Sequence, residues 1–174
     1  MYPEIADFFD FVDMKENYPF TGTGNLYNFC VGLCRINVIN NIMVIFDNDT
    51  AGVEKYKKAV LLKKPQSFFV TKLPDYSDFC NIQTVGPQGK TIENINGKAV
   101  AIECFLDFGS VSYPPSIRWT EYKKNEKAYQ GELENKDDYV RAFKQASLTD
   151  STYDNRKLKY LIDYLIDQWI NRLQ

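Results

Sequence analysis

The pattern of apolar and polar residues alternates between strand-like and helix-like periods in the first 110 residues of this 174-residue chain. Residues 8–14 carry an alternating aromatic run and predict a short strand, whereas residues 26–36 repeat apolar side chains at helical spacing. The unbroken apolar run at residues 42–46 predicts a central parallel strand covered on both faces. A helix over residues 51–62 and a strand over residues 67–73 are predicted to follow.

The second half of the chain shows a weaker pattern. Residues 75–97 contain turn signals and predict a loop, and residues 98–108 predict a helix. A further strand is predicted over residues 116–122, and helices are predicted over residues 128–145 and 155–173.

The order of these elements predicts an α/β fold of the Rossmann-like kind, with a mostly parallel central sheet flanked by helices. We expect an α/β core over residues 1–112 and a C-terminal helical extension over residues 113–174 that packs on this core.

The composition of the chain limits the kinds of catalytic and metal sites that it can form. The sequence contains no histidine, which excludes Ser-His-Asp and Cys-His nucleophile systems and zinc sites with His ligands. The net charge of −2 argues against a large cationic surface for duplex binding. The four cysteines are interpreted as small buried hydrophobic residues. With no signal-peptide pattern and no apolar run near about 20 residues, we expect a cytoplasmic protein without a membrane partner.

The strongest chemical signal follows the apolar run. Asp47 and Asp49 are two positions apart, so on an extended backbone their side chains share a face. They would stand at the carboxyl end of a central strand, where open α/β sheets place their ligand crevices. Two neighbouring carboxylates repel each other unless a cation lies between them, and Mg²⁺ or Mn²⁺ prefers such oxygen ligands. We predict a metal site here; the alternative is a polar turn and helix cap.

Further charged residues are candidates for the same site. Glu103 is the candidate for an additional acidic ligand, with Glu93 and Asp75 as alternatives. Lys72 and Lys98 are candidates for binding phosphate close to the metal. A solvent-exposed charge is the simpler interpretation for each of these residues.

Aromatic residues make up 15% of the sequence. We interpret them mainly as core residues and in part as an interface to other parts of a longer protein. Arg118, Trp119 and Tyr122 are candidates for stacking on nucleobases, although a structural role is the simpler interpretation.

Two families place an Asp-x-Asp motif at the end of an apolar strand. The segment Asp47-Asn48-Asp49-Thr50 resembles the motif of haloacid-dehalogenase phosphatases, which implies Asp47 as nucleophile and Asp49 as acid/base. Such an enzyme would also need a lysine and a downstream acidic pair, for which Asp137-Asp138 is available within a predicted helix. Toprim (topoisomerase–primase) domains follow the motif with a helix that contains Ala-Gly, and the segment from Asp47 to Gly52 fits them equally well.

The wider chain, over about residues 5–145, resembles the Toprim half of HEPN/Toprim-type bacterial proteins. The resemblance rests on the order and spacing of short motifs: Gly22-Thr23-Gly24-Asn25-Leu26, Phe46-Asp47-Asn48-Asp49, Val85-Gly86-Pro87-Gln88-Gly89, Ile95-Asn96-Gly97-Lys98-Ala99, Ala101-Ile102-Glu103-Cys104, Arg118-Trp119-Thr120 and Tyr129-Gln130-Gly131-Glu132-Leu133-Glu134.

The resemblance implies a Toprim fold that uses Mg²⁺ for phosphoryl transfer on nucleic acid, in the manner of the Toprim nucleases of phage-defence systems. It also implies Asp47 and Asp49 as catalytic metal ligands, Glu103 as a weaker candidate ligand, and an upstream HEPN-like domain as a partner.

One departure from the Toprim pattern affects the expected activity. Toprim domains carry a Glu in a Val-Glu-Gly-like turn on a strand that precedes the Asp-x-Asp strand, and this sequence contains no such segment. Glu4 has neither an apolar strand before it nor a glycine after it. We therefore expect a fragment or a shortened domain that is inactive alone, with an open sheet edge that favours a homo-oligomer. A non-catalytic Toprim-like module that binds nucleic acid or protein is the second hypothesis.

Overall fold

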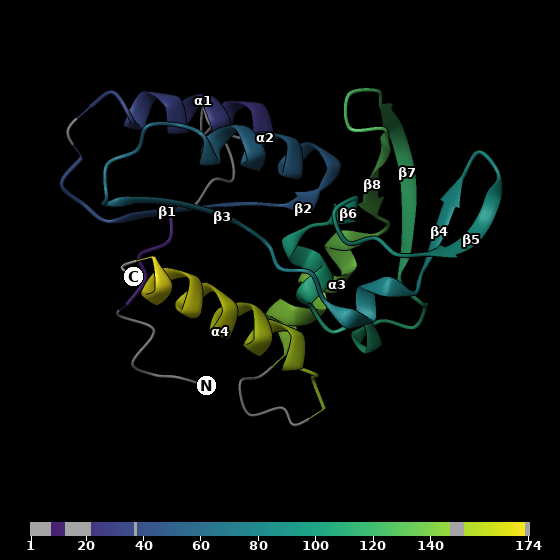
Figure 1. Ribbon diagram of the computed structural model, residues 1–174. Helices are drawn as coiled ribbons and strands as arrows, with labels where there is room; N and C mark the ends of the chain where they lie inside the picture. Colours follow the sequence, from purple (N-terminus) through teal and green to yellow (C-terminus); the bar gives the residue numbers. More distant parts are fainter. Residues whose placement is uncertain (1–7, 13–21, 37, 147–151, 173–174) are drawn as a thin grey trace.

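The computed structural model describes residues 8–12, 22–36, 38–146 and 152–172 and shows a mixed α/β chain (Figure 1). Its helices and strands are α1 (Thr23–Leu33), β1 (Ile42–Phe46), β2 (Asn48–Asp49), α2 (Thr50–Val60), β3 (Phe68–Lys72), the 3-10 helix η2 (Ser77–Cys80), β4 (Ile82–Gly86), β5 (Gly89–Glu93), β6 (Ala99–Val100), the 3-10 helices η3 (Ile102–Phe105) and η4 (Phe108–Ser110), β7 (Ser116–Lys123), β8 (Ala128–Leu133), α3 (Lys136–Gln145) and α4 (Arg156–Asn171).

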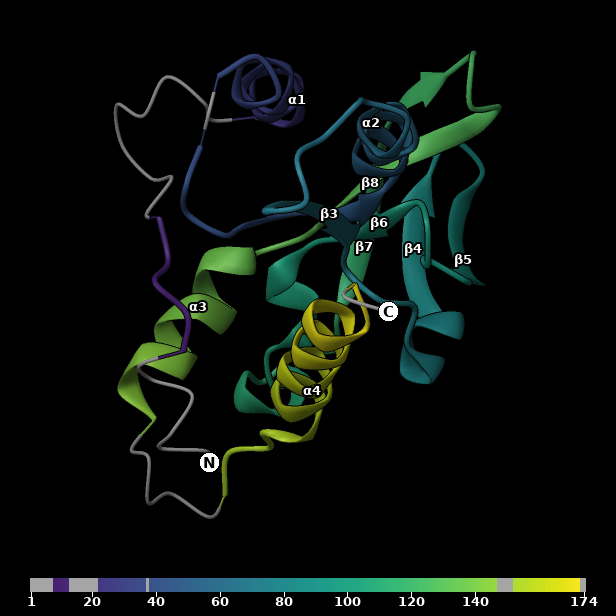
Figure 2. The ribbon, with the colours of Figure 1, turned by 60° about the vertical axis from the view of Figure 1, so that its left-hand side comes forward.

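Strand β1 is covered on both faces, as its unbroken apolar sequence predicts, but it is not a central strand in the described part of the chain, because β3 is its single partner there. It pairs in parallel with β3; α1 and α2 lie side by side over one face of this pair, and α4 crosses the other face (Figures 1 and 2). Val44 and Phe46 pack in the cluster formed with α1 and α2. Met43 and Ile45 pack against the cluster that contains Leu161 of α4. The alternation of β1 side chains therefore joins two hydrophobic cores.

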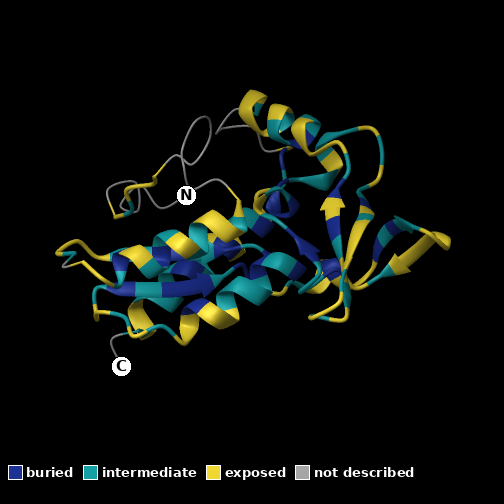
Figure 3. Ribbon diagram, turned by 90° about the horizontal axis from the view of Figure 1, so that it is seen from above, coloured by how far each residue is buried: buried dark blue, intermediate teal, exposed yellow. Residues whose placement is uncertain are grey.

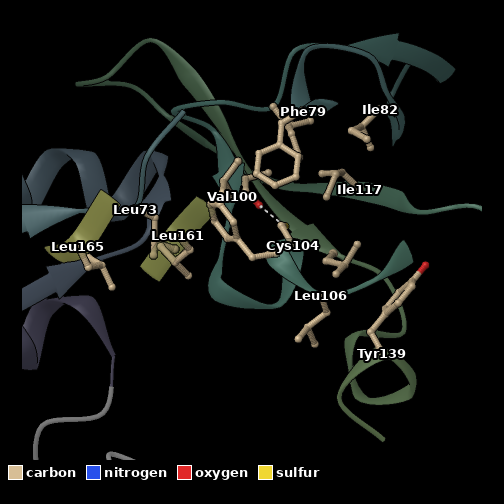
Figure 4. Packing of buried hydrophobic residues seen from close by; sticks show 14 residues of the cluster. Leu73, Phe79, Ile82, Val100, Cys104, Leu106, Ile117, Tyr139, Leu161 and Leu165 are labelled. Carbon is tan, nitrogen blue, oxygen red and sulfur yellow. Dashed lines mark hydrogen bonds between the residues drawn. The ribbon is translucent and has the colours of Figure 1, made fainter. Parts of the chain in front are cut away.

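The larger core lies where α3, α4, β7 and the 3-10 helices meet (Figure 4). The rings of Phe79 and Phe105 meet edge to face with their centroids 5.2 Å apart, a favourable arrangement for aromatic pairs. Lys157 is buried against this core and donates a hydrogen bond from Nζ to the Cys104 carbonyl at 2.8 Å. Figure 3 shows burial along the inner strands and exposure on the outer helix faces and on the β5 side of the β4–β5 hairpin.

Most strand pairs among the described residues are antiparallel. A four-stranded sheet has the order β5-β4-β7-β8, in which only the β4–β7 pair is parallel, and β2 pairs antiparallel with β6. The prediction of a mostly parallel sheet is therefore wrong for this part of the chain. The reason is two tight hairpins, β4–β5 and β7–β8, which bring sequence neighbours together in opposite directions.

Three predicted elements are wrong. Residues 75–97, predicted as a loop, hold η2 and the β4–β5 hairpin, and residues 98–108, predicted as a helix, hold β6, η3 and η4. Residues 128–133 form β8 instead of the start of a helix, so the predicted helix is confirmed only over α3. In β8 only Gly131 and Leu133 are buried, and the sequence does not alternate regularly between apolar and polar residues, so it gives no strand signal.

The N-terminal prediction also fails. Residues 8–12 form no strand, and Phe8, Phe11 and Val12 are exposed; residues 13 and 14 of the predicted strand lie outside the described part. Cys30 and Cys104 are buried as expected, whereas Cys34 is half-buried and Cys80 is exposed.

No helix among the described residues is both long and apolar enough to cross a membrane.

Candidate functional site

Asp47 lies at the carboxyl end of β1, and two other acidic residues act on it electrostatically. Its side chain is half-buried. Burial, which is the largest cause, and the negative charges of Asp49 and Glu103 together raise the pKa of the Asp47 carboxyl to about 7, while Lys136 opposes this increase. Acidic residues at the end of β1, the start of α2 and η3 therefore interact electrostatically, and we call Asp47, Asp49 and Glu103 the acidic cluster. Their role as metal ligands stays a prediction.

Asp49 is held by hydrogen bonds at both carboxylate oxygens. As N-cap of α2 it accepts a hydrogen bond from the Gly52 amide to Oδ1 at 2.6 Å, which confirms the helix-cap interpretation. Gln130 of β8 donates from Nε2 to Asp49 Oδ2 at 2.6 Å and accepts at Oε1 from the Ala51 amide at 2.9 Å. Each carboxylate oxygen carries further lone pairs, so a cap and a metal ligand can be the same residue.

Gly52 allows α2 to begin directly behind Asp47. A Cβ atom at this position would lie 2.1 Å from the Asp47 carbonyl oxygen and 3.0 Å from Asp49 Oδ1. Because real Cβ atoms do not approach backbone oxygens so closely, only glycine fits there. The glycine of the Ala-Gly sequence after the motif is therefore required for α2 to pack against Asp47 and Asp49.

The alternative acidic candidates lie elsewhere. Asp75 accepts hydrogen bonds at Oδ1 from Asn48 Nδ2 at 2.7 Å and from Lys72 Nζ at 3.3 Å. Glu93 accepts from Thr84 and Trp119 in a separate cleft. Glu103 is thus the additional acid whose charge acts on Asp47.

The two candidate phosphate-binding lysines have protein partners of different kinds. Lys72 donates from Nζ to Asn48 Oδ1 at 3.0 Å as well as to Asp75, so its charge is compensated beside β3. Lys98 directs Nζ toward Glu93, 3.9 Å away, while its carbonyl accepts hydrogen bonds from the amides of Thr50 and Gly131. The backbone of Lys98 therefore adjoins the start of α2, while its side chain lies in the cleft with Glu93.

Asp137 and Asp138 are the acidic pair that a haloacid-dehalogenase phosphatase would need, and Asp138 interacts with residues outside the candidate site. Asp138 of α3 accepts hydrogen bonds from the Tyr113 hydroxyl at 2.5 Å and from Arg141 Nη1 at 3.1 Å, and Asp137 is exposed.

Sequence reasoning missed Gln130 and Lys136. Gln130 belongs to the motif from Tyr129 to Glu134, but the predicted helix concealed that it lies in a strand facing α2. Lys136 opens α3 and is the cation that acts on Asp47. The local sequence holds no signal for the position of Gln130, because residues 128–133 do not alternate regularly between apolar and polar side chains.

Gln130→Leu is expected to lower the melting temperature by about 2–8 °C, because it leaves the Ala51 amide and one Asp49 oxygen without their partner, at a cost of about 1–2 kcal/mol. Gln145→Leu, at an exposed position near the end of α3, is the matched control and should leave the melting temperature nearly unchanged. Equal melting temperatures for the two variants in thermal unfolding would contradict this role of Gln130.

The donor chemistry of the acidic cluster fits Mg²⁺ better than a metal that needs many protein ligands. Within the described ranges no three acidic or cysteine side chains form a complete ligand group. Mg²⁺ is commonly bound through one or two carboxylates and retains several water molecules. Asp47 and Asp49 are the residues that would hold it, with Glu103 adding negative charge.

Comparison of the chain with protein-family models, with curated proteins and with solved structures gave no match. The resemblance to Toprim domains therefore stays a prediction that rests on the sequence motifs.

Proposed function

We propose that this chain is a Toprim-like domain of a metal-dependent nuclease-type protein that acts in phage defence. Its Asp47 and Asp49 would hold Mg²⁺ or Mn²⁺ for phosphodiester chemistry on nucleic acid, together with other parts of a longer protein such as a HEPN-like domain. The observation that supports the proposal is that the negative charges of Asp49, which is the N-cap of α2, and of Glu103 both act on the Asp47 carboxyl.

Asp47 and Asp49 would contribute to metal binding in different ways. A bound metal would supply an activated water and stabilise the leaving oxygen, chemistry that a chain without histidine cannot supply from imidazole. Asp47 is half-buried, so its charge is costly without a cation and is favoured with one. Asp49 is fixed in place by Gly52 and Gln130, which limits the reorganisation needed on binding.

Calorimetry with Mg²⁺ and Mn²⁺ tests the proposal. We expect binding by the wild-type chain and none by the double variant Asp47→Asn, Asp49→Asn. The double variant Asp137→Asn, Asp167→Asn removes the same charge at two exposed positions and should bind as the wild type does. Binding should also release protons near pH 6.5, because the Asp47 pKa of about 7 leaves that carboxyl largely protonated without metal.

Two results would contradict the metal site: no heat of binding with the wild-type chain, or equal binding by the Asp47→Asn, Asp49→Asn variant. Where binding is found, cleavage assays with single- and double-stranded substrates would then test the nuclease activity itself.

A non-catalytic Toprim-like module that binds nucleic acid or protein is the second candidate. It is favoured by the engagement of both Asp49 oxygens in hydrogen bonds within the protein. In this case nucleic-acid binding would be the same with EDTA and with Mg²⁺.

A further inference from the structure

A second hollow lies apart from the acidic cluster, between the β4–β5 hairpin and the β7–β8 hairpin. It has a volume of about 400 Å³, within the range of small-ligand sites. The side chains that give it chemical character are Glu93, Lys98, Trp119, Tyr122, Lys127 and Tyr129. We call this the hairpin cleft.

One carboxylate in the hairpin cleft is fixed in orientation. Glu93 Oε1 accepts hydrogen bonds from Thr84 Oγ1 at 3.0 Å, Thr91 Oγ1 at 2.9 Å and Trp119 Nε1 at 3.2 Å. Burial alone would raise the pKa of Glu93, but these hydrogen bonds outweigh it and lower the pKa below its usual value. The carboxylate is therefore ionised at neutral pH. Its second oxygen, Oε2, has the Lys98 ammonium 3.9 Å away and retains capacity to accept a hydrogen bond.

Three aromatic rings line the same cleft. The Tyr122 and Tyr129 rings meet edge to face at 5.0 Å, and the Trp119 ring lies 6.4 Å from that of Tyr129. Gly86 and Gly131 contact Trp119 closely, since a Cβ atom at either position would lie within 2.8 Å of the indole. Trp119 is thus held in place by packing and by its bond to Glu93, while Tyr122 and Tyr129 stay 47% and 40% exposed.

Two lysines supply positive charge beside these rings. Lys98 Nζ lies 6.0 Å from the centroid of the Trp119 ring. Lys127, in the turn between β7 and β8, is exposed and has a φ of 52°, a conformation that favours glycine or asparagine. In the described part of the chain no acidic side chain forms an ion pair with Lys127. A lysine at this position is free to meet an anion.

We propose that the hairpin cleft binds a nucleobase with an exocyclic amine, together with its phosphate. The base stacks on the aromatic rings, its amine donates to Glu93, and its phosphate is attracted by Lys98 and Lys127. The inference rests on the proposed function in taking nucleic acid as the substrate. The backbone of Lys98 forms an isolated parallel β-bridge with that of Asp49, so a nucleic-acid strand anchored in the hairpin cleft would lie close to Asp49.

Trp119 itself reports on this binding. The chain has two tryptophans, so Trp169→Phe leaves Trp119 as the single tryptophan, whose emission is excited apart from that of the tyrosines at wavelengths that tyrosine does not absorb. Titration with an oligo-dA strand, and separately with AMP, in EDTA should quench its emission to saturation. Binding of both ligands identifies a mononucleotide site, whereas binding of the strand alone identifies a site that needs neighbouring phosphates. Anisotropy of labelled oligo-dA with the unaltered chain is the second measurement.

Two variants, the second with a matched control, locate the contacts. Tyr122→Leu should weaken binding by about five- to a hundredfold through lost stacking. Lys127→Asn suits the left-handed backbone at this position; it should weaken binding and lower the salt dependence of log K by about one. Lys124→Asn removes an exposed charge of the same turn that does not line the hairpin cleft, and should change neither quantity.

The proposal is overturned if neither ligand quenches Trp119 and anisotropy shows no binding, or if both variants bind as the wild type does. Equal affinity for oligo-dT, which lacks an exocyclic amine, would overturn the contact to Glu93. The two proposals fail separately, because these titrations need no metal. Nucleobase binding by the wild-type chain without Mg²⁺ binding contradicts the metal site alone, and Mg²⁺ binding by the wild-type chain without nucleobase binding contradicts the hairpin cleft alone.

Discussion

Asp47→Asn is expected to stabilise the metal-free protein at pH 8 by up to about 4 kcal/mol, while it abolishes stabilisation by Mg²⁺. The pKa of Asp47 is about 7 in the folded chain against an ordinary value of 3.8, because the carboxyl is half-buried and faces two other acids. A difference of about three pH units between the two pKa values corresponds to about 4 kcal/mol. Asparagine keeps the shape of the side chain and removes the charge that causes this cost.

The direction of the pH dependence follows from the same two pKa values. Between about pH 4 and pH 7 the folded chain keeps a proton on Asp47 that the unfolded chain has lost, so this group makes the folded state less stable as pH rises. This loss of folding stability is complete above about pH 7. Urea unfolding in EDTA at pH 5 and pH 8 should therefore show a larger advantage of Asp47→Asn over the wild type at pH 8.

Asp137→Asn, at an exposed position, is the control and should show no such difference between the two pH values. An equal advantage of Asp47→Asn at both pH values would contradict the raised pKa. Saturating Mg²⁺ should raise the melting temperature of the wild type and leave that of Asp47→Asn unchanged, because only a ligand that binds the folded state stabilises it.

Gly52→Ala is expected to lower the melting temperature by about 6–12 °C and to weaken metal binding. The added Cβ atom would lie 2.1 Å from the Asp47 carbonyl oxygen and 2.8 Å from its carbon, so α2 must move away from the acidic pair. Overpacking against backbone costs about 3 kcal/mol, which gives this temperature change for a chain of this length. Differential scanning calorimetry and the Mg²⁺ titration measure the two effects.

The matched control is Gly32→Ala in α1, where nothing lies within 4 Å of the added atom. Alanine favours helix more than glycine does, so this variant should gain up to about 1 kcal/mol. A melting temperature of Gly52→Ala as high as that of Gly32→Ala would show that α2 does not depend on close contact with Asp47.

The parts of the fold that could be predicted are those whose pattern has one explanation. The run at residues 42–46 is apolar at every position and short, which favours a strand covered on both faces, and it forms β1. By contrast, residues 128–133 combine polar and charged side chains with Gly131, and their partner strand β7 decides their conformation. Tertiary pairing of this kind is invisible in a local pattern.

The same distinction applies to the candidate site. Asp47 and Asp49 could be located because a strand end and a helix start are read from neighbouring residues. Gln130 and Lys136 could not, because they reach the site from β8 and α3, whose positions depend on the β4–β7 pairing. Lys72 was a candidate because it ends a strand, and only the structure reveals its compensation by Asn48 and Asp75.

The side-chain amide of Gln130, which donates one hydrogen bond and accepts another, has a consequence for synthesis of the chain. It joins Asp49 and Ala51 to a residue about 80 positions further along, so α2 receives this support only after β8 has been made. In a nascent chain that ends before residue 128, Asp49 would have its cap bond from the Gly52 amide but not its bond from Gln130. The second carboxylate oxygen of Asp49 therefore gains its partner only after residue 130 has left the ribosome.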